Sequence, residues 1–446
     1  MSPTLALLIC TLFVLFMLRI DHKQSTGVSF ALWIPTIWML LISSKPLGVW
    51  FGIGGVDMES GSSLDRSVLT VILFLGLIIL LNRHFSWSNA IKENIWLMLL
   101  ISYMLFSVLW SDLPFVSFKR WIKEFIAVII AFFILTEPEP RQALQSIFRR
   151  TIYILIPFSY VLIHYFPDLG REYARWTGDL MWIGVATQKN GLGRLCLFAA
   201  FFLIWTFIRR WQGRDVPATG YQTFFEVLIL ILTFWLMGGP QHNFSYSATT
   251  NVAFVVGLLA LNGLFWMKKR GVAFGPTIFI IITAFIIVYG TITPFVGSLS
   301  LVDISSIFKR NETLTGRSEI WAILIPYAMQ KPIWGHGFGG FWTEEIQSIT
   351  STHAHNGYLD VVLNVGFFGL LLFSIFILSC SRKVQIVMTH DFDWGNLFIC
   401  FLLMAIVHNI AESTIVGFTG GLSVILLFMS VFSKRLTEVS EKCDVS

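Results

Sequence analysis

The chain alternates between long apolar runs and shorter polar connections over nearly all of its length. Apolar runs of this length with few charges are typical of helices that cross a membrane. The pattern predicts an all-α, polytopic integral membrane protein with about 12–13 transmembrane helices, although one of the shorter runs could be re-entrant. The runs lie near residues 3–20, 28–43, 68–82, 95–110, 121–136, 150–166, 193–208, 222–238, 250–267, 275–293, 357–380, 395–409 and 415–433.

The composition agrees with this pattern, because 55% of the residues are hydrophobic and only 13% are charged. Four of the five cysteines lie in or beside apolar runs, so neither a disulfide framework nor a zinc site is expected. The net charge of +5 mostly reflects the connections between helices and gives no reason to expect a nucleic-acid partner.

Basic residues concentrate in one set of alternate connections, such as Arg149 and Arg150 or Arg209 and Arg210. Short basic connections face the cytoplasm in most membrane proteins, so the C-terminus is predicted to be cytoplasmic. Residues 1–446 are expected to form a single membrane domain. A large extracytoplasmic loop with an amphipathic helix is expected at 294–356, inserted between membrane helices. The other outer connections are 44–67, 111–120, 167–192 and 239–249.

Two of the outer segments carry basic residues against this charge bias. Binding an anion at the outer membrane face is the simplest explanation for basic groups there. The residues are Arg171, Arg175, Lys189 and Arg194 around the first segment, and Lys309, Arg310, Arg317 and Lys331 in the second.

Arg317 belongs to a segment, Thr315–Gln330, whose apolar residues recur at helical spacing. This spacing predicts an amphipathic helix on or near the membrane surface, with Arg317 in its first turn. Free amides at a helix start and a guanidinium group together form a good seat for a diphosphate. Alternatively, Arg317 pairs with Glu312 or Glu319, or contacts lipid headgroups.

His353 and His355 directly precede a predicted membrane helix and are followed by Asn356. A neutral imidazole is suited to general-base catalysis because its ordinary pKa lies near ambient pH. The alternative is a helix cap built by His355 and Asn356. A metal site needs further ligands, and no other cluster of His, Cys or Asp is evident, so we predict neither a metal nor a cofactor.

Two other polar stretches could contact a sugar or a phosphate. Lys189, Asn190 and Arg194 lead into a membrane helix from the outer side, where they could also be solvated. Ser247 and Thr249 lie in an outer connection and could hydrogen-bond phosphate oxygens or cap a helix.

The glycine-rich segment Pro332–Trp342 resembles a phosphate-binding loop only superficially. No strand precedes it, and no Lys with a Ser or Thr follows it. We therefore expect a folded turn that returns the amphipathic helix to the bundle.

Four elements occur in order along the chain: QKNGLG (188–193), SATT (247–250), TGRSEIW followed by PIWGHGFG, and HAHNGYLDVVLNVGFFGL with Glu412 and Ser413 beyond it. Together they resemble the O-antigen ligase and polymerase superfamily. The earlier stretches ALWIPTIWMLLISSKPLGVW and SGSSLDR are similar to its exopolysaccharide (succinoglycan-type) polymerases. Each motif alone is weak, whereas their order and spacing together are fairly specific.

The resemblance implies a GT-C-like membrane fold and a metal-independent, inverting glycosyltransferase whose donor glycan is carried on undecaprenyl diphosphate. It implies that His355 deprotonates the acceptor hydroxyl and that Arg317 holds the donor diphosphate. Many relatives carry an arginine where this chain has Ala248, so Lys189 or Arg194 would have to supply a second charge. Supporting contacts are expected from His353, Asn356 and Asp360.

The expected function is the polymerisation of lipid-linked repeats into exopolysaccharide at the periplasmic face of the bacterial inner membrane. An O-antigen ligase, which moves the glycan to lipid A core or to a protein, would share the same chemistry. The sequence is also compatible with a polysaccharide-related transporter or with a structural membrane protein. Besides membrane lipids, a flippase and chain-length regulator proteins are expected partners.

Overall fold

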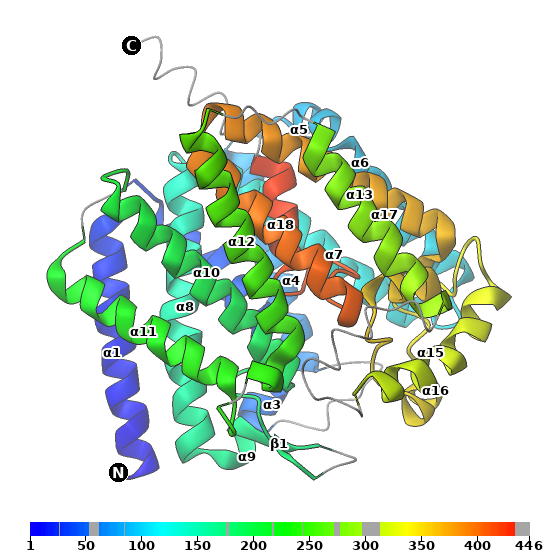
Figure 1. Cartoon of the computed structure of the whole chain (residues 1–446), viewed down its shortest axis with the longest axis horizontal. Helices are drawn as coiled ribbons and strands as arrows, with labels where there is room; N and C mark the ends of the chain where they lie inside the picture. Colours follow the sequence, from blue (N-terminus) through cyan, green and yellow to red (C-terminus); the bar gives the residue numbers. More distant parts are fainter. Residues whose placement is uncertain are drawn as a thin grey trace. The chain divides into compact units, whose positions relative to one another are not determined.

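The computed structural model describes residues 1–25, 27–52, 62–83, 85–174, 178–215, 218–242, 244–271, 277–296 and 313–432. The chain divides into two compact units, which are described separately (Figure 1). The first unit comprises Met1–Gly55, Ser62–Phe85 and Phe132–Val255, and the second comprises Val56–Gly61, Ser86–Ala131 and Val256–Ser446.

Helices make up almost all of the regular structure in the described residues. The first unit contains α1 (Pro3–Gln24), η1 (Phe30–Leu32), α2 (Trp33–Ile42), α3 (Leu47–Phe51), α4 (Ser63–Asn82), α8 (Pro140–Tyr165), α9 (Pro167–Gly170), α10 (Lys189–Trp211), α11 (Gly220–Gly238) and η3 (Phe244–Ser247). The second contains α5 (Trp87–Glu93), α6 (Ile95–Phe106), η2 (Ser107–Trp110), α13 (Thr277–Val296), α15 (Thr313–Gln330), α16 (Glu344–Ile349), α17 (Gly357–His390) and α18 (Phe392–Ala411). Helices α7 (Pro114–Leu135) and α12 (Ala248–Lys269) have residues in both units.

The prediction of an all-α, multi-pass membrane protein is confirmed. Nine helices in the described part of the chain are long and apolar enough to cross a membrane, or up to ten if the bent pair formed by α5 with α6 and η2 is one span. The other predicted runs overlap α7 and two shorter apolar helices, Phe30–Ile42 and Ser423–Phe432. The last run was predicted from residue 415, but its helix begins only at Ser423.

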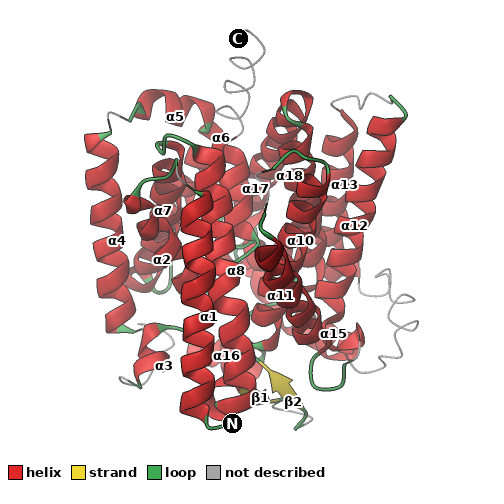
Figure 2. Cartoon of the chain, turned by 90° about the vertical axis from the view of Figure 1, so that its left-hand side faces the viewer, coloured by secondary structure: helices red, strands yellow, loops and turns green. Residues whose placement is uncertain are grey.

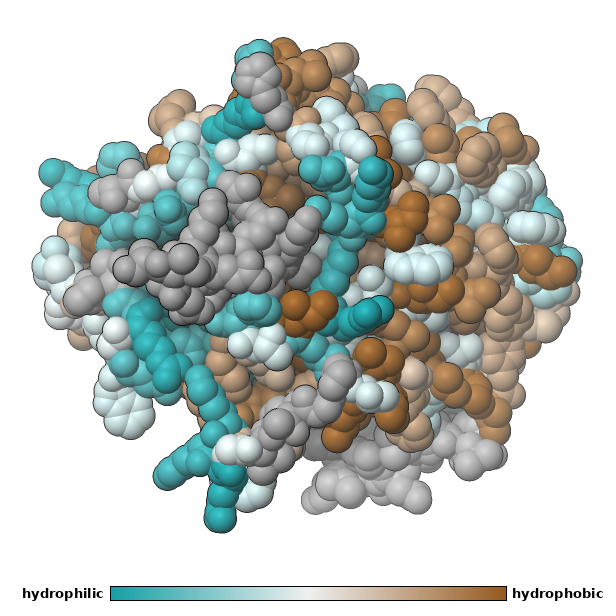
Figure 3. All heavy atoms as spheres, turned by 90° about the horizontal axis from the view of Figure 1, so that it is seen from above, coloured by the Kyte–Doolittle hydropathy of each residue, from teal (hydrophilic) through white to brown (hydrophobic). Residues whose placement is uncertain are grey.

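The long helices leave large apolar side chains open to the surroundings, as expected where lipid replaces water. On α1 these include Leu8, Leu12 and Leu15, and on α13 they include Ile281 and Phe285. Figure 3 looks onto one face of the molecule, where hydrophobic side chains in brown are exposed beside hydrophilic ones in teal. The high apolar content of the sequence therefore appears partly as side chains that are exposed on the surface of the protein.

The first unit is built around α8, which packs against α1, α2, α10 and α11. Arg149 and Arg150 of this helix both bind the buried carboxylate of Asp21 on α1. The two short strands β1 (Arg171–Tyr173) and β2 (Leu180–Trp182) form an antiparallel pair, shown in yellow in Figure 2. This pair follows α9 in the connection between α8 and α10.

The second unit is organised around α17, which packs against α18, α13 and α6. Gly366 interrupts α17 with a φ of +71°, a left-handed conformation that glycine adopts without a steric penalty. The Pro332–Trp342 segment folds against this kink: the Phe367 amide donates to Pro332 O, and the His336 amide donates to Leu363 O. The expectation of a folded turn is confirmed, since the segment anchors α15 to the kinked helix.

Candidate active site

Helix α15 carries Arg317 toward the histidines that precede α17. Trp321, Leu324 and Ala328 are buried along one side of the helix, as the predicted spacing requires. The Trp321 indole Nε1 donates to Ala354 O at 2.9 Å, which ties the helix to the loop between His353 and His355. The helix itself is confirmed, but it begins at Thr313, so Arg317 is its fifth residue and lies beyond the predicted first turn. Its location at the membrane surface stays a prediction.

The loop before α17, which carries His353 and His355, is fixed by hydrogen bonds to the first turn of that helix. Asn356 caps the helix by accepting a hydrogen bond from the Leu359 amide at 2.9 Å, and the Ala354 amide donates to Asp360 at 3.2 Å. His355 has a φ of +52°. A left-handed backbone at a residue other than glycine costs energy, and such strain is often found at functional sites.

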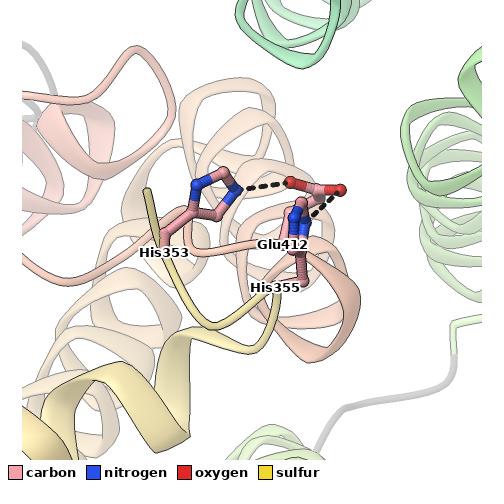
Figure 4. A group of neighbouring side chains, drawn as sticks. All are labelled: His353, His355 and Glu412. Carbon is pink, nitrogen blue, oxygen red and sulfur yellow. Dashed lines mark hydrogen bonds and ion pairs between the residues drawn. The ribbon is translucent and has the colours of Figure 1, made fainter. Parts of the chain in front are cut away.

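Glu412, the residue directly after α18, is the centre of a charged cluster (Figure 4). Its Oε2 lies 3.3 Å from His353 Nε2, and its Oε1 lies 3.5 Å from His355 Nδ1. Arg317 approaches the same Oε1 with its Nη2 at 3.2 Å. The Nδ1 atom of His355 is buried without a closer partner, so its 3.5 Å contact is an ion-pair separation rather than a normal hydrogen bond.

The predicted partners of Arg317 differ from the one found. Its ion pair is with Glu412, which lies 95 positions later in the chain. Glu312, one of the two expected partners, lies outside the described residues, as do Lys309 and Arg310. Helix α15 therefore carries its cation to a carboxylate from another element.

The carboxylate of Glu412 is ionised in this setting. Burial by itself would raise its pKa, but the contacts with His353 and His355 and the charge of Arg317 hold the pKa well below its usual range. Both imidazoles and the guanidinium remain partly exposed, with side-chain exposures of 15%, 22% and 21% in that order. A buried anion thus holds three groups that a substrate can still reach.

A cavity of about 400 Å³ adjoins this cluster within the second unit. His353 and Asp360, both predicted as site residues, are on its wall, together with Ser413 from the segment after α18. The basic side chains on the wall, Arg120 and Lys123, come from α7. The remaining lining residues are Glu124, Phe338, Gly339, Trp342, Thr352, Asn364, Thr414, Val416, Gly417, Thr419 and Gly420.

His353, His355 and Glu412 are also a donor set that a metal ion could use, because their ligand atoms lie within 4.8 Å of one another. The sequence did not reveal the third donor, since Glu412 lies far from the histidines along the chain. Arg317 contacts the same carboxylate, and its positive charge opposes a cation at that oxygen. The absence of a metal requirement stays a prediction.

The other residues predicted to bind substrate fall into two groups. Asn356 is buried, and its amide group donates to Gly290 O and Ile410 O while its oxygen caps α17. With both ends of the amide engaged, the structure favours the helix-cap alternative over a contact with substrate. Asp360 is also buried but lines the cavity, where it accepts from the Trp342 indole at 3.0 Å.

The second group belongs to the first unit, whereas the histidines belong to the second. Lys189, Asn190 and Arg194 begin α10. A β-carbon at Gly193 would come within 2.7 Å of Ser247 Oγ, so the QKNGLG and SATT stretches meet. Lys189 also lies over the Tyr246 ring, and Thr249 is half-buried in the first turn of α12. Arg175 lies outside the described residues.

Three residues of this site escape prediction from the sequence. Glu412 stands out in the sequence only as a polar group between two apolar runs and as part of the resemblance. Arg120 and Lys123 are absent from the predicted site, although they depart from the charge bias of an outer connection in the same way as Arg317. That departure is the signal that could have found them.

Together, the fold and the site define a multi-pass, all-α membrane protein with a histidine, arginine and carboxylate cluster beside a cavity. Comparison with known proteins shows which family the chain resembles. A family model described as O-Antigen ligase matches residues 243–374, a range that includes Arg317, His353 and His355. The predicted resemblance to the O-antigen ligase and polymerase superfamily is therefore confirmed over this part of the chain.

Two curated proteins are similar to the chain. The exopolysaccharide production protein ExoQ of Rhizobium meliloti is 20% identical over 301 residues, which are 64% of this chain and 64% of that protein. The ComP-specific O-oligosaccharyltransferase of Acinetobacter baylyi is 26% identical over 239 residues, or 48% of this chain and 42% of that protein. The chain thus spans less than two thirds of the length of either relative.

Proposed function

We propose that this protein is a membrane glycosyltransferase. In this proposal it polymerises oligosaccharide repeats linked to undecaprenyl diphosphate into exopolysaccharide at the outer, periplasmic face of the bacterial inner membrane. The observation that carries the proposal is the Glu412 cluster, in which one buried carboxylate contacts Arg317, His353 and His355, with His353 also on the wall of a cavity. Acid–base and anion-binding groups meet there.

The base in this proposal is His355, activated by Glu412. The carboxylate faces Nδ1, so Nδ1 carries the proton in the neutral ring and Nε2 keeps its lone pair. Nε2 lies 3.3 Å from Ser351 Oγ, a position that an acceptor hydroxyl would take over. The resulting imidazolium is then stabilised by the ionised Glu412, as in other carboxylate–histidine pairs.

The transfer balances as a single displacement. The acceptor oxygen gives its proton to Nε2 of His355 and forms a bond to the anomeric carbon of the donor glycan. The bond from that carbon to the diphosphate breaks, and its electron pair leaves with the diphosphate. Attack opposite to the leaving group inverts the anomeric centre, and the guanidinium of Arg317 stabilises the departing charge.

Metal independence is part of the proposal, because Arg317 supplies the positive charge that a divalent cation would otherwise provide. The similarity to an exopolysaccharide production protein supports a role in making exopolysaccharide, which in this proposal is its polymerisation. A ligase is the second candidate, supported by the family description and by the oligosaccharyltransferase relative. A flippase and chain-length regulators are proposed as partners, alongside membrane lipids.

Deleting the gene and fractionating the surface glycans separates the two candidates. We expect single unpolymerised repeats to accumulate on the lipid carrier. Full-length polymer that remains attached to undecaprenyl diphosphate would instead indicate a ligase. Normal amounts of full-length surface polymer would contradict both.

Complementing the deletion with variants tests the assigned roles. His355→Ala and Arg317→Ala should each stop polymer formation while the protein still inserts in the membrane, because each removes a group that acts on the reacting atoms. His390→Ala is a matched control, since this histidine is exposed at the end of α17, outside the site. Polymer of normal length from either site variant would show that its role is wrong.

A further inference from the structure

The cavity beside the histidines has an uneven distribution of accessible charge. Arg120 and Lys123 lie three residues apart on α7, a spacing that places both on the same side of the helix. Lys123 is exposed and Arg120 is partly exposed. Arg120 also donates to Gly339 O, which fixes its position at the cavity wall.

The two carboxylates on the wall are buried and already bound by the protein. Glu124 accepts from the Phe418 amide and from Thr419 Oγ1, the latter at 2.9 Å. Asp360 accepts from the Trp342 indole and from the Ala354 amide. The charge that a ligand can meet in the cavity is therefore positive.

The cavity and Arg317 approach the carboxylate of Glu412 on different oxygen atoms. His353 lines the cavity and contacts Oε2 of Glu412, whereas Arg317 contacts Oε1 and is not part of the cavity wall. Arg317 thus contacts the Glu412 carboxylate directly, while Arg120 and Lys123 line the cavity together with His353. Arg317 suits the donor diphosphate, and the two cations of the cavity wall face the space that a second molecule would enter.

We propose that this cavity is the acceptor subsite and that Lys123, with Arg120, selects an acceptor sugar that bears a carboxylate. The inference rests on the proposed function, in which a second glycan must present its hydroxyl to the histidines. A volume of about 400 Å³ lies within the range of pockets that enclose small ligands. Trp342 and Phe338 supply apolar surface for a sugar ring, and the exposed Thr352 supplies a hydroxyl group.

Binding without turnover tests this subsite independently of catalysis. The full-length protein is purified in a neutral detergent and titrated with trigalacturonate, with the carboxyl-reduced trisaccharide and with inorganic diphosphate. Lys123→Gln removes the charge, and Lys119→Gln is the matched control. Lys119 lies on the same helix, but its Nζ is 4.8 Å from the centre of the Phe115 ring and it does not line the cavity.

We expect trigalacturonate to bind more tightly than its reduced form. Lys123→Gln should weaken trigalacturonate binding about tenfold, as for the loss of one charge-assisted hydrogen bond, while Lys119→Gln should leave it unchanged. Binding that depends on Lys123 should also weaken as ionic strength rises.

Equal affinities for the acidic and the reduced trisaccharide would overturn the proposal, as would equal effects of Lys123→Gln and Lys119→Gln. Lys123-dependent binding of diphosphate without binding of trigalacturonate would also overturn it, because the cavity would then hold a phosphate group. Selective trigalacturonate binding in a protein that fails to elongate any lipid-linked glycan would retain the subsite and reject the proposed function.

Discussion

Two buried carboxylates, one in each unit, show how similar chemistry serves different purposes. Asp21 in the first unit binds Arg149 at 2.7 Å and Arg150 at 2.8 Å, and both guanidinium groups are themselves almost fully buried. Glu412 in the second unit contacts three groups that can carry positive charge, namely Arg317, His353 and His355. Unlike the two arginines at Asp21, these groups remain partly exposed, and His353 lines a cavity.

The two carboxylates differ in whether the side chains around them remain accessible to a ligand. The oxygens of Asp21 are filled by arginines and by Ser146, and Arg150 is further covered by the Trp33 ring at 4.7 Å. Such a network stabilises the fold and offers nothing to a ligand. Glu412 instead orients side chains toward an accessible space, which is what catalysis requires.

The largest expected effect is on the folding of the first unit. Asp21→Asn leaves two arginines buried without their counter-ion and should reduce the free energy of unfolding by about 3–5 kcal/mol. Thermal unfolding of the purified protein in detergent measures this loss. Activity per folded molecule should remain normal; if it falls as strongly as in Glu412→Gln, the two carboxylates do not differ as described.

The next effect is on catalysis in the second unit. Glu412→Gln keeps a side chain of similar shape but removes the charge that orients His355 and stabilises its protonated form. Polymer formation should fall by about 10²-fold or more, within the range attributed to acid–base groups. The initial rate of glycan elongation is the measurement, and a rate within a few-fold of the unaltered protein would remove Glu412 from the mechanism.

A smaller effect concerns acid stability. Because the pKa of Glu412 is depressed in the folded protein, its ionised form stabilises the fold above the ordinary glutamate value of 4.5. At pH 7 the unaltered protein should be more stable than Glu412→Gln by about 1–3 kcal/mol. This gap should shrink as the pH falls below 4.5 and toward the depressed pKa. Unfolding midpoints of both proteins over this pH range test the linkage, and a constant gap would contradict it.

The smallest expected effect is that of metal removal. Because Arg317 already contacts the carboxylate shared by the two histidines, EDTA should change the elongation rate by less than about twofold. The protein is treated with EDTA, dialysed into metal-free buffer and assayed with and without added Mg²⁺, Mn²⁺ or Zn²⁺. Loss of activity that one of these ions restores would make His353, His355 and Glu412 a metal site.

Much of the fold was predictable because the bilayer imposes a strong pattern on the sequence. Apolar runs mark helices whatever their neighbours are, so each predicted run overlaps a helix of the structure, although the last helix begins eight residues later than predicted. Which helices pack together depends on side-chain shape, and no periodicity reveals it. The sequence pattern therefore gave no sign that the chain divides into two compact units.

The site was predictable only where its residues are close in sequence or carry an unusual charge. His353 and His355 stood out because they are neighbours, and Arg317 because it runs against the charge bias. Glu412 comes from a separate segment 57 positions after His355, and only folding brings it between the histidines and Arg317. Lys123 belongs to a helix that precedes them all by almost 200 positions or more.

The central claim is that the Glu412 cluster catalyses the elongation of a lipid-linked glycan. Its most direct test is elongation of a purified undecaprenyl-diphosphate-linked repeat by the full-length protein in detergent, with product length read by gel electrophoresis. The unaltered protein and His390→Ala should produce a ladder of longer glycans, while His355→Ala and Arg317→Ala leave the single repeat unchanged. A normal ladder from His355→Ala or Arg317→Ala would contradict the account.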